Sequence, residues 1–180
     1  MREPGGTPIG EEIRALLLDP RHREMAPRTE MLLFAASRAQ LVAEVIAPAL
    51  ARGTLVLCDR FVDASLAYQG VGRGLGVDVV RAVNAAATDG LAPDLTLLLD
   101  VEPAVGLRRA RAAPAGWHGG DRLERETLAF HEQVREGFLA LARNEPHRIV
   151  TIDARGSVAG VHQAITQAVD GFLRRRRQGP

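Results

Sequence analysis

The sequence contains no lysine, since all 23 of its lysine-or-arginine positions are arginine. A mechanism that needs a lysine, such as the phosphate-binding lysine of a G-x-x-x-x-G-K-[ST] loop, therefore cannot be completed within these 180 residues. Cysteine occurs once, which excludes a disulfide framework. No apolar run approaches the roughly 18 residues that a membrane span needs, so we expect no membrane partner.

The composition is typical of one soluble globular domain, residues 1–180. The chain is 46% hydrophobic and 25% charged, which suits a buried core of ordinary size. Its formal net charge of +1 gives no overall attraction to nucleic acid. We interpret "RRRR" at 174–177 as a solvated helix end rather than a nucleic-acid patch. The first residues lack the pattern of a signal or transit peptide, so we expect a cytoplasmic protein.

Three short apolar runs predict parallel strands, because buried strands of this kind appear as continuous apolar stretches. They are "TLVLCD" (54–59), "LTLLLD" (95–100) and "RIVTID" (148–153). Helical spacing predicts helices at 10–19, 28–53, 62–69, 77–89, 103–113, 122–144 and 157–175, with a bend at Pro48. This order predicts an α/β fold with a parallel sheet, helices on both faces, and a site at the carboxyl ends of the strands.

A polar stretch, "CDRFVDASLAYQGVGRG" (58–74), starts at the carboxyl end of the first predicted strand. Asp59 can ligate a hydrated cation, and the guanidinium of Arg60 fits a phosphate or a carboxylate. A structural salt bridge explains such a pair as well. The glycines of this stretch do not match G-x-G-x-x-G, because the last position is Leu75, so we exclude a dinucleotide fingerprint.

The long helix predicted at 28–53 carries a second candidate. Phe34 and Arg38 share one helix face, so a ring and a guanidinium could together hold a flat base. A core phenylalanine beside a surface arginine is the plainer explanation. The helix is apolar nearly all round, which indicates that it is buried in the core or covered by a partner.

Arginines flank the loop "AAPAGWHGG" (112–120), which is either a mobile flap or an inert surface loop. Arg109 and Arg111 precede the loop, and Arg122 follows it in "DRLE" (121–124). Arginines beside a mobile loop can close over a polyphosphate and stabilise the charge that is passed in phosphoryl transfer. A charged helix face with partners three or four residues apart explains them equally well.

Six stretches together carry a resemblance to a known family. They are "REPGGTPIGEEIRALLL", "FAASRAQLVAEVIAPAL", "VLCDRFVDASLAYQGVGRGL", "PDLTLLLDVEPAVGLRRAR", "DRLE" and "TIDA". In order and approximate spacing, and over essentially the whole chain, they resemble thymidylate kinase. The resemblance implies a P-loop nucleoside monophosphate kinase fold with three layers. It also implies phosphoryl transfer from ATP to dTMP with Mg²⁺, by a homodimer whose contact face is the long helix.

The resemblance implies a set of dTMP-binding side chains, which comprises Arg2, Phe34, Arg38, Arg60, Ser65, Tyr68, Gln69 and Arg73. Arg2 and Arg60 match the arginines that hold the 5′-phosphate. Phe34 matches the ring stacked on thymine, and Arg38 matches the guanidinium at the base edge. Tyr68 matches the tyrosine under the deoxyribose, whose bulk disfavours a 2′-hydroxyl. Ser65 and Gln69 are the expected polar contacts around the base.

The same resemblance implies the residues of phosphoryl transfer, which are Asp59, Arg60, Arg109, Arg111 and Arg122. Asp59 resembles the strand-end acid at the magnesium and phosphate centre. The last three arginines correspond to the lid, residues 112–120 and their flanks. Ala154 lies where the loop after the last strand approaches adenine.

Two positions depart from the family pattern. Ala64 stands where relatives commonly have a serine, so one polar contact is missing or is taken over by Ser65. Some relatives carry further arginines in the stretch matching 112–120, whereas this chain has none there. The resemblance therefore does not identify which lid arginine meets the transferred phosphoryl group.

The largest departure precedes the REPGG segment. Family members have a strand, a G-x-x-x-x-G-K-[ST] loop and a helix there, and the loop cradles the phosphates of ATP. The missing strand belongs at the centre of the sheet, between 54–59 and 95–100, so we expect exposed apolar edges. We expect a family member whose true start lies upstream of Met1 and whose 180 residues alone are inactive. The alternatives are a non-catalytic dTMP-binding or interaction protein, and another nucleoside monophosphate kinase.

Overall fold

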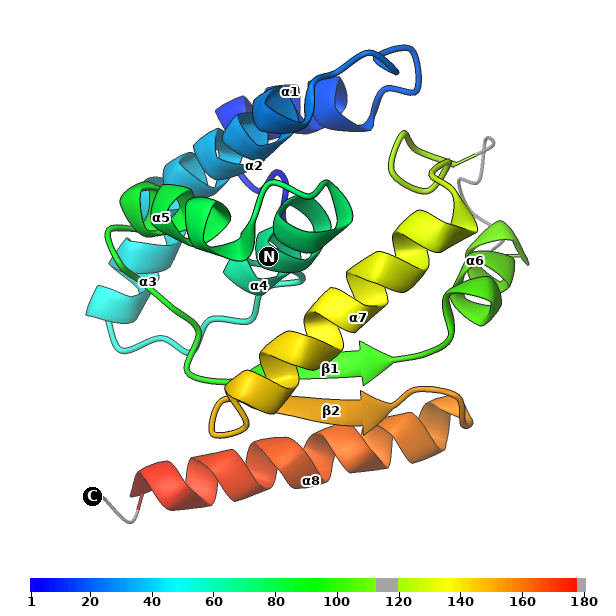
Figure 1. The fold of residues 1–180 in the computed structure, drawn as a ribbon. Helices are drawn as coiled ribbons and strands as arrows, with labels where there is room; N and C mark the ends of the chain where they lie inside the picture. Colours follow the sequence, from blue (N-terminus) through cyan, green and yellow to red (C-terminus); the bar gives the residue numbers. More distant parts are fainter. Residues whose placement is uncertain (113–119, 178–180) are drawn as a thin grey trace.

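A two-stranded parallel sheet and a larger number of helices make up the computed structural model, which describes residues 1–112 and 120–177 apart from the side chain of Arg111. Strand β1 (Thr96–Asp100) pairs with β2 (Ile149–Asp153), so two of the three predicted strands are confirmed. Helix α7 (Leu128–Asn144) packs on both strands, and α8 (Val158–Arg177) runs along β2 (Figure 1). Most of the predicted lid loop, 113–119, lies outside the described residues.

The remaining helices lie near their predicted positions. They are α1 (Pro8–Leu18), α2 (Pro27–Leu41), η1 (Val42–Ile46), α3 (Ala47–Ala51), α4 (Val62–Ser65), η2 (Leu66–Gly72), α5 (Val77–Thr88) and α6 (Pro103–Ala112). Two of these segments, η1 and η2, are π-helical turns. The first ends two residues before Pro48, whose missing N–H and bulky ring disturb the hydrogen bonding of the preceding turn. The second contains Tyr68 and Gln69.

The prediction of a strand at 54–59 is wrong. This segment is extended but forms only an isolated parallel bridge, between Asp59 and Arg2. A strand needs a continuous ladder of hydrogen bonds, and residues 1–3 reach only the end of this segment. Leu55 and Leu57 are consequently 63% and 75% exposed.

The predicted helix at 122–144 begins later than expected, because α7 starts at Leu128 after the N-cap Thr127. The side chain of Asp121 accepts hydrogen bonds from the N–H groups of Leu123 and Glu124. These local bonds hold the segment in turns, since an Asp side chain competes with a helical backbone for the same donors. Arg122 therefore lies in a turn rather than on a helix.

The continuous helix Pro27–Ala51 is long and apolar enough, by length and composition alone, to cross a membrane. In this structure 44% of its most apolar window is buried inside the protein, and α1 and α5 pack against α2. The helix also carries Glu30 and Arg38, which are buried and paired within the fold. A core position thus accounts for its apolar character, and both the homodimer and the lack of a membrane partner stay predictions.

We predict fast amide hydrogen exchange in residues 55–58, because their N–H groups donate no hydrogen bond to the described residues. The amide of Ala154 is the control, since it donates to the Asp100 carbonyl at 2.8 Å. We expect the first group to exchange at least about a hundredfold faster, as expected for unprotected amides compared with amides in a paired sheet. Hydrogen exchange read by NMR checks this, and equal protection would mean that the segment is paired.

Candidate functional site

A cavity of about 120 Å³, called the small cavity below, lies between the REPGG turn, α2 and the α4–η2 segment. Six of the eight predicted dTMP-binding residues line it: Phe34, Arg38, Arg60, Ser65, Tyr68 and Gln69. The structure thus brings together residues from two separate stretches of the sequence. Arg2 and Arg73 are not among the lining residues.

Arg38 is buried, with 1% of its surface exposed, so it is not the surface arginine of the plainer sequence interpretation. Its Nε and Nη2 donate to Glu3 Oε2 at 2.8 and 2.6 Å, and its Nη1 donates to Asn84 Oδ1 at 2.5 Å. Burial raises the pKa of Glu3 above its usual value, although Arg38 acts in the opposite direction. Glu3 Oε1 is buried and accepts no hydrogen bond from the described residues. The cavity wall therefore contains a fixed guanidinium and an unsatisfied carboxylate oxygen.

Arg60 has a left-handed backbone, with φ of 64°, which is uncommon for a residue with a long side chain. Its guanidinium lies over the ring of Tyr68, 5.1 Å from the ring centre. Such strained conformations persist only where the surroundings impose them, and they cluster at functional sites. This geometry places a cation at the border of the cavity, directly above an aromatic ring.

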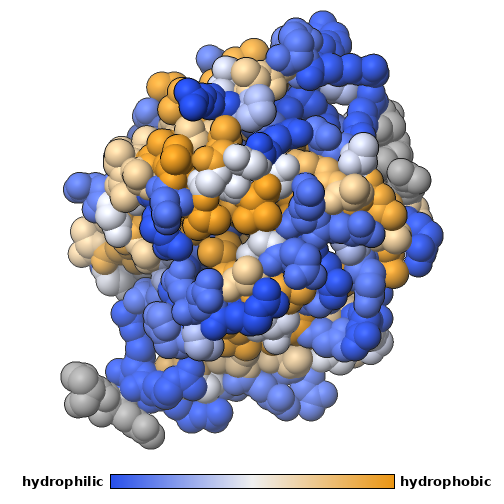
Figure 2. Space-filling model, viewed as in Figure 1, coloured by the Kyte–Doolittle hydropathy of each residue, from blue (hydrophilic) through white to orange (hydrophobic). Residues whose placement is uncertain are grey.

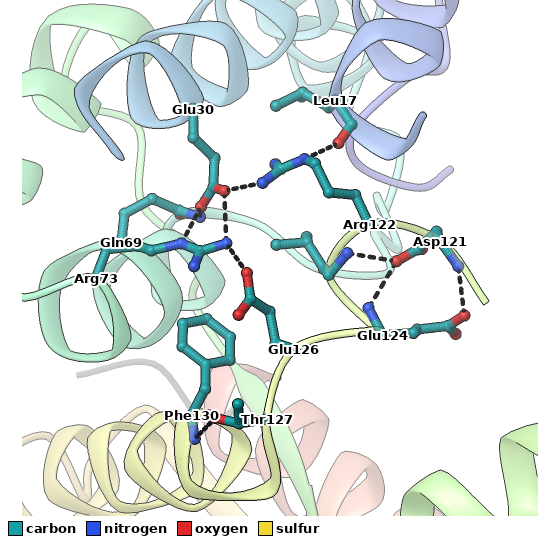
Figure 3. A network of polar contacts seen from close by, with 11 residues as sticks. Leu17, Glu30, Gln69, Arg73, Asp121, Arg122, Glu124, Glu126, Thr127 and Phe130 are labelled. Atoms are coloured by element: carbon teal, nitrogen blue, oxygen red, sulfur yellow. Dashed lines mark hydrogen bonds and ion pairs between the residues drawn. The ribbon is translucent and has the colours of Figure 1, made fainter. Parts of the chain in front are cut away.

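Glu30 engages three of the sequence-predicted site residues. Gln69 Nε2 donates to Glu30 Oε1 at 2.8 Å, and Arg73 Nη2 donates to Glu30 Oε2 at 2.9 Å (Figure 3). Arg122 Nη1 lies 2.6 Å from Glu30 Oε2, and Arg122 Nε donates to the Leu17 carbonyl. Arg73 and Arg122 thus point at a buried carboxylate, away from the small cavity, whereas Gln69 also lines the cavity.

The other predicted site residues lie outside the small cavity. Arg2 pairs with Glu11 at 3.0 Å and is half exposed. Arg109 donates to the carbonyl oxygens of Ala154 and Arg155, at 2.8 and 3.1 Å, so two residues assigned to the ATP side do meet. Arg111 is in α6, but its side chain lies outside the described residues.

A larger space of about 1050 Å³, called the central groove below, opens between the 54–59 segment and β1. Its lining is largely apolar and includes exposed leucines on both sides, such as Leu57 and Leu99. Figure 2 shows that apolar residues are exposed across this face of the molecule. The small cavity and the central groove share five lining residues: Arg60, Ala64, Tyr68, Glu124 and His131. The two spaces therefore meet at the Arg60–Tyr68 pair.

Asp59 is exposed, lines the central groove, and makes no side-chain hydrogen bond or ion pair with the described residues. No group of three metal-binding side chains occurs among residues 1–112 and 120–177. A single free carboxylate still suits Mg²⁺, which keeps several waters and is commonly bound by one or two carboxylates together with substrate phosphates. Asp59 therefore fits a magnesium site only of this hydrated kind.

Sequence reasoning missed Glu3, Glu30, Asn84 and His131. Glu3 lies next to Arg2 in the REPGG segment, which was the one available signal. Glu3 and Asn84 contact Arg38, and Glu30 contacts Gln69, across 35 to 46 positions of the chain. Local spacing does not reveal contacts between residues so far apart in the sequence. His131 lines both spaces, and its buried Nε2 has no partner among the described residues.

Comparisons with known proteins identify relatives that match most of this chain. The family model of thymidylate kinase matches residues 1–165. The chain is 53% identical over 176 residues to the thymidylate kinase of Geobacter sulfurreducens, a match that covers 97% of this chain and 81% of the relative. It is 52% identical over 172 residues to the thymidylate kinase of Desulfosudis oleivorans, covering 94% and 80% of the two chains. The thymidylate kinase of Caldanaerobacter subterraneus is 47% identical over 174 residues.

We predict that Glu3→Ala lowers the free energy of unfolding by about 3 to 5 kcal/mol, because it leaves Arg38 buried without a counter-charge. The control is Asp94→Ala, which breaks an ion pair with Arg176 whose side chains are both more than half exposed. We expect the control to change stability by less than about 1 kcal/mol. Urea unfolding followed by circular dichroism measures both, and equal effects would refute the buried-pair argument.

Proposed function

Because the chain belongs to the thymidylate kinase family, we propose that it binds dTMP in the small cavity and serves the transfer of a phosphoryl group from ATP to dTMP. One observation carries the proposal: six side chains assigned to dTMP through the family resemblance line one cavity. Phe34 supplies a ring for stacking on the base, and Arg38 supplies a guanidinium at its edge. This arrangement suits a pyrimidine nucleotide held by stacking and directed hydrogen bonds.

Arg60 is proposed to hold the 5′-phosphate. A guanidinium presents two parallel N–H donors to a phosphate and stays charged at any physiological pH. Arg60 borders both the small cavity and the central groove, so a phosphate bound there is accessible from the groove side. Tyr68 beneath it leaves less room for a 2′-hydroxyl, which favours a deoxyribose.

Mg²⁺ would be held by Asp59 with its remaining ligands from water and nucleotide, and it would supply charge neutralisation on the phosphates. The 180 residues contain no G-x-x-x-x-G-K-[ST] segment and no lysine, so these residues do not fit the triphosphate. What this chain's own residues do is bind and orient the acceptor nucleotide.

The central groove is proposed to accept one further parallel strand between the 54–59 segment and β1, which would complete a three-layer P-loop kinase fold. Residues 55, 56 and 58 on one side of the groove and the outer edge of β1 on the other have no backbone partner among the described residues, and both sides carry exposed leucines. Such edges favour strand addition. The matched relatives extend beyond the aligned part, since the match covers about 80% of their length. Protection of the amides of residues 55–58 in the hydrogen-exchange experiment would contradict this proposal.

A non-catalytic dTMP-binding protein is the second candidate, since the 180 residues lack a phosphate-binding loop of the family kind. We predict that these residues alone have negligible kinase activity. Preorganised hydrogen-bond donors to the phosphates raise the rate constant by a factor on the order of 10² to 10³, and the missing loop would supply such donors. A coupled assay of ADP release with ATP and dTMP measures this. Ordinary turnover would show that other groups fulfil the role of the loop.

We predict that Arg60→Ala weakens dTMP binding by about ten- to a hundredfold, because a hydrogen bond to a charged group contributes roughly 1.5 to 3 kcal/mol. Arg52→Ala is the matched control, since Arg52 is exposed and lies outside both spaces. Isothermal titration calorimetry with dTMP, dUMP, UMP and AMP measures affinity and also separates this function from that of another nucleoside monophosphate kinase. An unchanged dTMP affinity in Arg60→Ala would contradict the assignment.

A further inference from the structure

Glu30 is fully buried in the first turn of α2 and accepts from three side chains (Figure 3). Its Oε1 accepts from Gln69 Nε2 at 2.8 Å and from Arg73 Nε at 3.2 Å. Its Oε2 lies 2.9 Å from Arg73 Nη2 and 2.6 Å from Arg122 Nη1. Both carboxylate oxygens are thus occupied by donors from η2, from Arg73 after it, and from the 121–127 turn.

The carboxylate of Glu30 is ionised at neutral pH. Burial acts to raise its pKa, but hydrogen bonds from Arg73 and Gln69 and the nearby guanidinium charges leave the pKa below its usual value. An ionised carboxylate only accepts hydrogen bonds. Whatever faces Glu30 must therefore be a donor.

This requirement determines the orientation of the Gln69 side-chain amide. Only its nitrogen can face Glu30, so its oxygen Oε1 faces the other way. Gln69 is 1% exposed and lines the small cavity, and no donor among the described residues reaches Oε1. With a neutral or amide partner in place of Glu30, both orientations of Gln69 would be open, because a carboxamide donates at one end and accepts at the other.

We propose that Glu30 is a positioning residue of the small cavity: it orients the Gln69 amide so that the cavity presents an acceptor oxygen to the base. A base with an N–H at that edge, such as the imide of thymine, is then preferred over one with a ring-nitrogen lone pair there, as in cytosine. This inference rests on the proposed function, since it assumes that the base of the acceptor nucleotide occupies this cavity. Glu30 itself does not touch the nucleotide and acts through Gln69.

The test compares the affinities of dTMP and of 5-methyl-dCMP, which share the methyl group, the sugar and the phosphate. Isothermal titration calorimetry on the 180-residue protein gives the ratio of the two affinities. We expect Glu30→Gln to lower this ratio by about tenfold, because the new amide lets Gln69 turn and offer a donor to cytosine. A purely structural role would weaken both nucleotides together and leave the ratio unchanged.

Glu126→Gln is the matched control. Glu126 pairs with Arg73 at 2.7 Å in the same cluster, so its substitution removes the same charge. No hydrogen bond joins Glu126 to Gln69 among the described contacts, and we expect this variant to keep the wild-type ratio. An equal fall of the ratio in both variants would assign the effect to charge loss and overturn the proposal.

Gln69→Met keeps the test decisive if Glu30→Gln fails to fold, because it leaves Glu30 with both arginines while removing the acceptor oxygen. We expect it, too, to lower the ratio by about tenfold. If the wild type prefers dTMP and Gln69→Met retains that preference, the inference is wrong while the proposed function stands. If the wild-type protein binds neither nucleotide, the proposed function itself fails.

Discussion

The ion pair between Glu3 and Arg38 is the contact on which the small cavity depends. Both side chains are almost fully buried, at 2% and 1% exposed, and they join the REPGG turn to α2. Asn84 adds α5 to the same guanidinium. Separating these elements would leave a charge uncompensated in a low-dielectric interior, which is strongly unfavourable. The backbone positions of the turn and the two helices are therefore coupled, and this coupling fixes two walls of the small cavity, the turn and α2.

Guanidinium groups make the other buried connections as well. Arg148 joins β2 to the α4 segment through Asp63, at 2.7 Å, and Arg122 joins the 121–127 turn to α1 and α2. A guanidinium has five donors in a planar fork, so one side chain can satisfy partners from several elements at once. Arg60 and Arg38 line the small cavity itself, whereas Arg122 and Arg148 connect elements around it without lining it.

The small cavity and the central groove meet at Arg60 and Tyr68, and they differ in the side chains that line them. The small cavity is lined mainly by polar and aromatic side chains, whereas the central groove is wide and largely apolar. Arg60 borders both, with a strained backbone and with its cation over a ring. Under the proposed function, a nucleotide with its base in the cavity would present its phosphate toward the groove.

Local sequence pattern by itself determined β1, β2 and the approximate extents of the helices, because hydrophobic periodicity reflects which face of a segment is buried. Motif resemblance also indicated six of the residues that line the small cavity, but not Glu3 or His131, which line it as well. Tertiary structure alone decided that 54–59 is extended but paired only at its end, that Arg38 is buried, and that Arg73 and Arg122 face Glu30. A strand requires a partner ladder, and the partners of these arginines lie between 35 and 105 positions away, a separation that no local spacing encodes.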